Sequence, residues 1–146
     1  KIGGGLDDVW LNKQTKQLHI VDYKSTSVKK EGKGVTLDDP WKESYKRQMD
    51  LYVWVMKRLG FDTSDTGYFL YCDGDRFTET PFLGDDKAVM EFKMSLLPYV
   101  VKQSWIEPTL LSIKQVLEQK EMPAHSDTCE YGRFLSTLDN ITNNTI

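Results

Sequence analysis

The sequence is poor in the residues on which disulfide-rich folds and most metal clusters depend. It has two cysteines, Cys72 and Cys129, and two histidines, His19 and His125. Two cysteines are too few for a disulfide framework, so we expect a reducing, cytoplasmic environment. His125 and Cys129 alone are too few to build a zinc site. The absence of a glycine-flanked serine argues against a Ser-His-Asp hydrolase.

The sequence also lacks long apolar runs and an excess of positive charge. No stretch of about 18 apolar residues occurs, so we expect no membrane span. The opening residues, KIGGGLDDVW, lack the apolar core of a secretory signal. They approach a strand abruptly, so an upstream segment could be missing. The formal net charge of −3 gives no overall indication of nucleic-acid binding.

Positive charge is nevertheless concentrated in the first third of the chain. Segment 28–40 has two glycines, a proline and several lysines, and is predicted to be a mobile loop. Such a zone can guide a polyanion, although a merely solvated loop is the alternative. Trp41, beside this loop, could stack on a base, but packing is its favoured role. The basic residues that we expect near phosphates are Lys29, Lys30, Lys33, Lys46 and Arg47.

The pattern of apolar residues predicts an α/β domain over residues 1–136, followed by a polar tail over 137–146. Alternation and turn residues indicate strands, and recurrence at three and four positions indicates helices. The DGD sequence at 73–75 is typical of a hairpin turn. The expected elements are strands 5–11 and 17–23, helix 41–59 ending at Gly60, strands 66–72 and 76–82, a helix over 85–104 broken at Pro98, and helix 109–120.

A carboxylate and an ammonium group lie at the end of the second apolar strand, in LHIVDYKSTS. Alternate side chains of a strand share a face, so Asp22 and Lys24 are expected to lie on the same side. Burying an isolated charge is expensive, and the two groups could simply neutralise each other. An ion pair at a strand end is therefore one interpretation.

The preceding strand offers a second interpretation, because it carries Asp7 and Asp8. If the hairpin closes through NKQTK, Asp7 and Asp22 can lie on adjacent strands. Two converging carboxylates repel each other unless a proton or a cation lies between them. Oxygen-rich sites with one or two carboxylates suit Mg²⁺ or Mn²⁺, and the Tyr23 carbonyl could complete the set.

Three short motifs follow one another at characteristic intervals. They are Gly5-Leu6-Asp7, then Asp22-Tyr23-Lys24, then Gln48 with Tyr52 four residues later. Together they resemble the PD-(D/E)XK nuclease superfamily, specifically its RecB-like branch. The resemblance implies a restriction-endonuclease-like mixed β-sheet core flanked by helices.

The resemblance also implies roles for individual residues. Asp7, Asp22 and the Tyr23 carbonyl would bind Mg²⁺ or Mn²⁺, and Lys24 would be the catalytic lysine. Gln48 and Tyr52 share one helix face, and would hold Lys24 or contact the DNA backbone. Some members carry a cysteine-ligated iron–sulfur cluster, but Gly132 stands where the next such cysteine would be. We therefore expect no cluster.

The leading hypothesis is a metal-dependent nuclease that hydrolyses DNA phosphodiester bonds. We expect an exonuclease with little sequence specificity, acting on single- or double-stranded DNA, within a larger recombination or repair protein or complex. The alternative is a catalytically weak, nuclease-like domain that binds nucleic acid or acts as a scaffold. A third hypothesis is a small-molecule hydrolase or structural domain in which Asp22 and Lys24 form only an ion pair.

Overall fold

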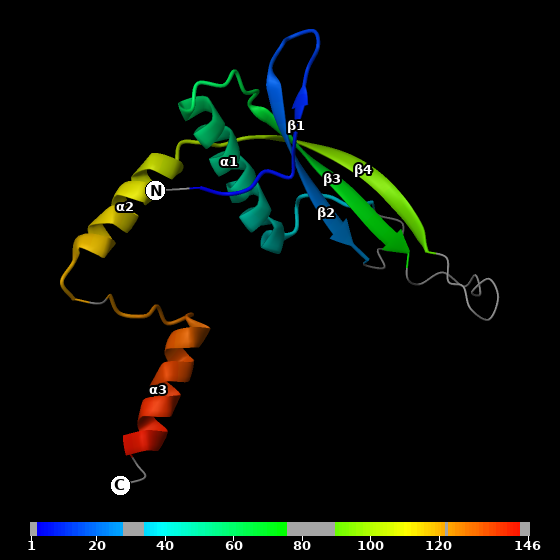
Figure 1. Ribbon diagram of the computed structural model, residues 1–146. Coiled ribbons are helices and arrows are strands. Elements are labelled where there is room, and N and C mark those ends of the chain that lie inside the picture. Colours follow the sequence, from blue (N-terminus) through cyan, green and yellow to red (C-terminus); the bar gives the residue numbers. More distant parts are fainter. Residues whose placement is uncertain (1–2, 28–33, 76–89, 122, 144–146) are drawn as a thin grey trace. The chain divides into compact units, whose positions relative to one another are not determined.

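The computed structural model describes residues 3–27, 34–75, 90–121 and 123–143 (Figure 1). The chain forms two units, Lys1–Ile106 and Glu107–Ile146, and each is described by itself. The predicted strand over 76–82 lies outside the described residues. The first unit contains a four-stranded mixed sheet in the order β1-β2-β3-β4, which confirms the expected α/β fold.

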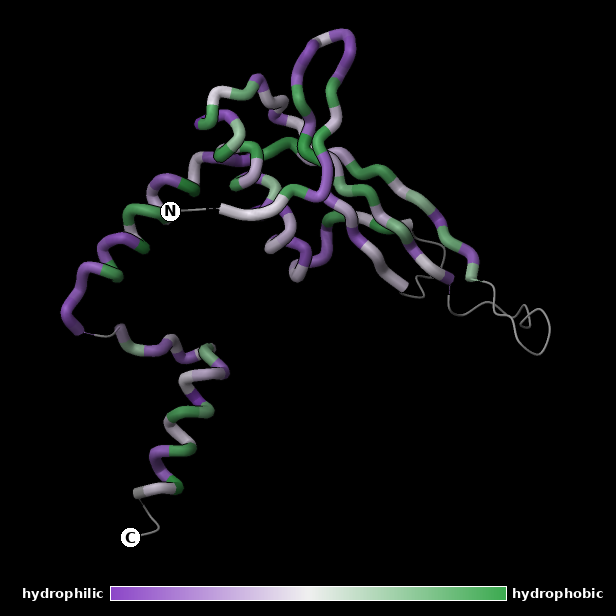
Figure 2. Tube along the Cα trace, in the orientation of Figure 1, coloured by the Kyte–Doolittle hydropathy of each residue, from purple (hydrophilic) through white to green (hydrophobic). Residues whose placement is uncertain are grey.

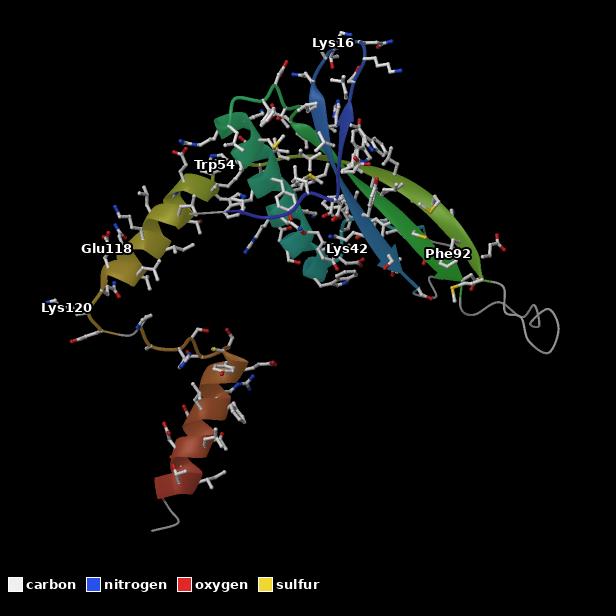
Figure 3. All side chains as sticks on the ribbon, in the orientation of Figure 1. Lys16, Lys42, Trp54, Phe92, Glu118 and Lys120 are labelled. Carbon is white, nitrogen blue, oxygen red and sulfur yellow. The ribbon has the colours of Figure 1, made fainter. Side chains whose placement is uncertain are left out.

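The first two strands form the predicted hairpin. Strands β1 (Asp8–Leu11) and β2 (Leu18–Thr26) pair in antiparallel fashion. The turn is closed by a hydrogen bond of 2.9 Å that Asn12 N donates to Gln17 O. Lys16, at the tip of the hairpin in Figure 3, has a φ of 65°. The hairpin fixes the register in which Asp8 lies opposite Val21, so Asp7 is one step beyond, beside Asp22.

A helical crossover joins β2 to its parallel neighbour β3 (Thr66–Asp75). Parallel strands need such a connection because the end of the first strand and the start of the second lie at opposite edges of the sheet. It consists of a short 3₁₀ turn, η1 (Pro40–Lys42), and helix α1 (Glu43–Arg58), which lies on one face of the sheet (Figure 1). Gly60 follows with a φ of +91° and donates to Lys57 O, as expected for a helix-ending glycine.

The fourth strand corrects the prediction of a helix over 85–104. Strand β4 (Glu91–Val100) pairs with β3 along its whole length, with Pro98 inside it. Apolar residues at 92, 96 and 100 fit a helical period, but those at 92, 94 and 96 also alternate. Pairing with β3 selects the alternating pattern. The expected hairpin turn at 73–75 is also wrong, because these residues continue β3.

The core lies between α1 and the sheet face that it covers. Met49 and Val53 of α1 are buried there with Ile20, Phe69 and other members of the same cluster. At Gly67 an added Cβ would lie 2.4 Å from Met49 Sδ, so any larger residue would require the buried Met49 side chain to shift. No helix of the described part of this unit covers the other sheet face (Figure 1), and the strands of the sheet contain hydrophobic residues (Figure 2). Several of these residues are exposed on that face. They include Tyr23, Phe92, Met94 and Leu96.

The second unit holds two amphipathic helices. Helix α2 (Ile106–Glu118) corresponds to the predicted helix over 109–120. Helix α3 (Glu130–Asn143) continues through most of the residues expected to form a polar tail. Within the described ranges, none of the helices combines the length and apolar character needed to span a bilayer.

Asp50 ties α1 to the segment that follows β4. Its side chain is 2% exposed. Its two oxygens accept hydrogen bonds from Lys102 N at 2.8 Å and from Trp105 Nε1 at 2.9 Å. Both donors come from residues more than fifty positions away, so this carboxylate fixes the helix against the far edge of the sheet.

Replacing Asp50 with alanine should destabilise the protein by about 2–4 kcal/mol, because two part-buried donors lose a charged acceptor. Urea unfolding followed by circular dichroism measures this change. The matched control is Asp65→Ala, which removes an exposed ion pair with Lys57 and should cost less than about 1 kcal/mol. Equal losses in the two variants would contradict the assigned role of Asp50.

Candidate metal-binding and catalytic site

The middle of β2, and not its end as expected, presents a carboxylate and an ammonium group on the face that α1 covers. Asp22 is 3% exposed, and its Oδ2 lies 2.6 Å from Lys24 Nζ. The Lys24 side chain remains 17% exposed. Its ammonium lies 4.5 Å from the centre of the Tyr45 ring, which comes from the first turn of α1. Lys24 is thus held between a buried carboxylate and an aromatic face, and still reaches solvent.

Asp7 lies next to Asp22. It is exposed and comes directly before β1. Its Oδ2 accepts a hydrogen bond of 2.9 Å from Tyr23 N, the amide directly after Asp22. The negative charge of Asp7 also contributes to raising the pKa of Asp22. The two carboxylates therefore converge from neighbouring chain segments.

Asp22 is an ionisable group in an unfavourable environment for charge. Burial is the main cause that raises the pKa of this carboxyl group, and Asp7 adds to it, while Lys24 acts in the opposite direction. Apart from the ion pair, Oδ2 has no hydrogen-bond partner in the part of the chain that is described. An oxygen that is buried, under-coordinated and next to a second carboxylate suits a divalent cation.

The neighbouring carboxylate of Asp8 is engaged elsewhere. It accepts hydrogen bonds from Val9 N at 2.7 Å, from Trp10 Nε1 at 2.9 Å and from the Tyr23 hydroxyl. The hydrogen bond from Tyr23 is the main cause that lowers the pKa of Asp8. Of the two acidic residues at the start of β1, Asp7 alone is thus placed beside Asp22.

Gln48 and Tyr52 interact directly on α1. Gln48 Nε2 donates a hydrogen bond of 2.7 Å to the Tyr52 hydroxyl. The ring of Tyr52 lies against Gly4, where an added Cβ would be 3.2 Å from Cε1. Tyr45 precedes Gln48 by three residues and therefore shares its helix face. The expected contact of the pair with Lys24 or with a nucleic-acid backbone stays a prediction.

The expected phosphate-binding residues are only partly described. Lys46 is half-buried and forms an ion pair of 3.6 Å with Glu43, and Arg47 is exposed on the next position of α1. Lys29, Lys30 and Lys33 lie outside the described residues. Their suggested role therefore stays a prediction.

The structure adds residues around the site that sequence reasoning did not single out. Lys42 is 1% exposed, and its ammonium bonds to the Thr36 carbonyl and lies 2.8 Å from Asp39 Oδ2 (Figure 3). It also lies 5.3 Å from the centre of the Tyr71 ring. Burial, followed by the charges of Tyr45 and Asp22, raises the pKa of Tyr71 to about 12. A lysine in an amphipathic segment carries no sequence signal of burial.

Within the described residues, no group of three or more histidine, cysteine or acidic side chains could hold a metal ion. The candidate set of metal ligands therefore consists of two carboxylates and a backbone carbonyl.

A family model described as the PD-(D/E)XK nuclease superfamily matches residues 1–135. The chain belongs to the PD-(D/E)XK nuclease superfamily.

Nucleases of the PD-(D/E)XK superfamily act on nucleic acid and usually use divalent metal ions such as Mg²⁺. The family model covers all three motifs on which the sequence resemblance rests, including the segment with Asp22 and Lys24. No curated protein and no solved structure matches the chain. The structure and the family model thus agree on a nuclease-type fold.

Replacing Asp22 with asparagine should raise the thermal midpoint of the metal-free protein at neutral pH. Because burial raises the pKa of Asp22 above its ordinary value of 3.8, folding favours the protonated form. This stabilisation is complete below the ordinary value and is lost as the pH rises through the folded-state pKa. Asparagine carries no charge, so the variant does not lose stability as the wild type does when Asp22 ionises. The advantage of the variant should therefore grow with pH.

Thermal unfolding in EDTA, from about pH 4 to about pH 8, tests this sign. The control is Asp8→Asn, which should give no such advantage because hydrogen bonds lower the pKa of Asp8. A midpoint of Asp22→Asn equal to or below that of the wild type at the upper end of the range would contradict the prediction.

Proposed function

We propose that this chain is a metal-dependent nuclease of the RecB-like branch that hydrolyses DNA phosphodiester bonds. The observation that carries the proposal is the convergence of Asp7 and Asp22 beside Lys24. The carboxylate of Asp22 is buried, and this burial raises its pKa, which means that it disfavours the charged form. Such an arrangement is costly for a purely structural role, because a buried carboxylate needs full compensation.

The proposed cation ligands are the carboxylates of Asp7 and Asp22 and the Tyr23 carbonyl. These are hard oxygen donors, which suit Mg²⁺ or Mn²⁺ with waters in the remaining positions. When bound, the ion would supply Lewis acidity and offset negative charge on the phosphate. The ion pair between Asp22 and Lys24 shows that this position already attracts positive charge.

Lys24 is the proposed catalytic lysine. Its ammonium is anchored by Asp22 and by the Tyr45 ring, yet it remains partly exposed. A cation held in this way can donate hydrogen bonds to a phosphate oxygen whose charge increases during hydrolysis. Because its position is fixed before substrate binds, little reorganisation is needed. Gln48 and Tyr52 are proposed to position the substrate backbone on the same side of α1.

We expect the protein to contact the nucleic-acid backbone and not the edges of the bases. Arg47 and Lys46 on α1, with Lys29, Lys30 and Lys33, are proposed to contact phosphates, which fix register without carrying sequence information. We therefore propose little sequence specificity and an exonuclease activity. The proposed setting is a cytoplasmic recombination or repair protein of which this chain forms part.

Cleavage of DNA should depend on Asp7, Asp22 and Lys24. Lys24→Ala should lower the rate about 10²- to 10⁴-fold, the usual contribution of a positioned acid or base. Asp7→Asn and Asp22→Asn should also abolish most activity. The assay follows labelled single- and double-stranded DNA in Mn²⁺ by gel electrophoresis, with RNA as a second substrate.

The matched control is Asp8→Asn, which alters the adjacent carboxylate and its hydrogen bond from the Tyr23 hydroxyl but none of the proposed ligand atoms. It should keep activity within about fivefold of the wild type, less than the loss expected for an acid or base group. Cleavage by all variants alike would indicate a contaminating nuclease. Binding without cleavage by the wild type would replace the proposal with that of a nucleic-acid-binding module.

Metal binding should stabilise the folded protein. Mn²⁺ at about 100 times its dissociation constant adds about 2.7 kcal/mol, which corresponds to a rise of about 5–10 °C in thermal midpoint. Asp7→Asn and Asp22→Asn should lose this rise, whereas Asp8→Asn should keep it. An equal shift in all four proteins would show that the ion binds elsewhere.

A further inference from the structure

Trp41 is exposed although its backbone is firmly held. The side chain is 55% exposed, and it lies in η1 directly after Pro40. Ser44 Oγ donates a hydrogen bond of 3.0 Å to Trp41 O. Lys42 N closes the same turn on Asp39 O at 2.9 Å. A large apolar ring left in solvent on a fixed backbone forgoes the stabilisation that burial would give it.

The orientation of the indole ring is set by two neighbours. The Tyr45 ring meets it edge-on, with the centroids 5.6 Å apart and an interplanar angle of 86°. The Lys42 ammonium lies 4.9 Å from the centroid of the indole and is almost fully buried. A cation over one face of an indole is a favourable arrangement. The ring is thus supported from within the protein and presents its remaining surface to solvent.

The same Tyr45 ring connects Trp41 to the candidate site. Its face lies 4.5 Å from Lys24 Nζ, while its other contact is with the indole. Lys24, Tyr45 and Trp41 therefore form a continuous row in which one ring separates the tryptophan from the proposed catalytic lysine. A strand with a phosphate at Lys24 would bring a neighbouring base into the region of Trp41.

We infer that Trp41 is a stacking platform for one nucleobase of the bound strand, an inference that rests on the proposed nuclease function. Every base has an aromatic face, so such a platform binds single-stranded nucleic acid with little sequence preference. Arg47, exposed one and a half turns further along the chain, is available for the backbone of the same strand. Tyr45 and Lys42 act as positioning residues for the platform.

Binding of fluorescein-labelled oligo-dT and oligo-U, measured by anisotropy in EDTA, tests the inference without any cleavage. Trp41→Ala should weaken binding about 5- to 100-fold, the range expected for one stacked base, and Trp41→Phe should lose much less. The matched control is Trp10→Ala, an exposed tryptophan on β1 that should change the dissociation constant less than about twofold. Equal affinities for wild type and Trp41→Ala would overturn the inference.

A scan with a single abasic nucleotide separates stacking from a structural role. In the wild type, the abasic nucleotide should weaken binding at one position of the strand, and in Trp41→Ala that sensitivity should disappear. A flat scan in the wild type, or a sensitive position that Trp41→Ala retains, would overturn the inference. A flat scan together with metal-dependent cleavage would reject the platform and leave the proposed nuclease intact.

A measurement on the wild-type protein covers the case in which Trp41→Ala does not fold. Strands carrying 5-iodouracil are irradiated in the complex, and the adduct is located by mass spectrometry. An adduct on Trp41 supports the platform, and adducts found only on other residues overturn it. An adduct on Trp41 in a protein that shows no cleavage in Mn²⁺ would instead identify a binding module. The stacking platform and the nuclease activity can therefore be rejected separately.

Discussion

The burial of Asp22 beside Lys24 is the constraint on which the rest of the site depends. A carboxylate with 3% exposure can remain charged only if positive charge lies close to it. Lys24 supplies one such charge at 2.6 Å, but Asp7 adds a second negative group. Two carboxylates and one ammonium group leave a local negative balance, which a divalent cation would reverse. The unfavourable environment of the Asp22 charge and the cation affinity that we propose for it therefore have the same origin.

The fold and the site are built from the same elements. Parallel pairing of β2 and β3 requires a crossover connection, and this connection supplies α1. The helix packs Met49 and Val53 into the core. Its adjoining face supplies Tyr45 to Lys24, and the hydrogen-bonded pair of Gln48 and Tyr52. A change that shifts α1 should therefore disturb catalysis and stability together.

Local patterns were sufficient to predict the hairpin, α1 and the first part of β3, and to bring Asp7 close to Asp22. Alternation places Asp22 and Lys24 on one face of β2 whatever the rest of the chain does. The identity of β4 could not be predicted in this way, because its apolar spacing fits both periods and its pairing partner is distant in sequence. The supporting contacts of Tyr45 and Lys42 also form only when the crossover packs on the sheet, so no local pattern predicts them.

Two buried aspartates, Asp22 and Asp50, differ in how fully their partners satisfy them. Asp50 accepts a backbone amide and an indole N–H, one for each oxygen, so its environment is complete without a ligand. Asp22 Oδ2 has the ammonium group of Lys24 but no hydrogen-bond partner among the described residues, and burial raises its pKa. Evolution for stability alone would favour the first kind of site, because an incompletely satisfied buried charge costs free energy. The energetic incompleteness of Asp22 is therefore the main physical support for the proposed role of this position in metal binding.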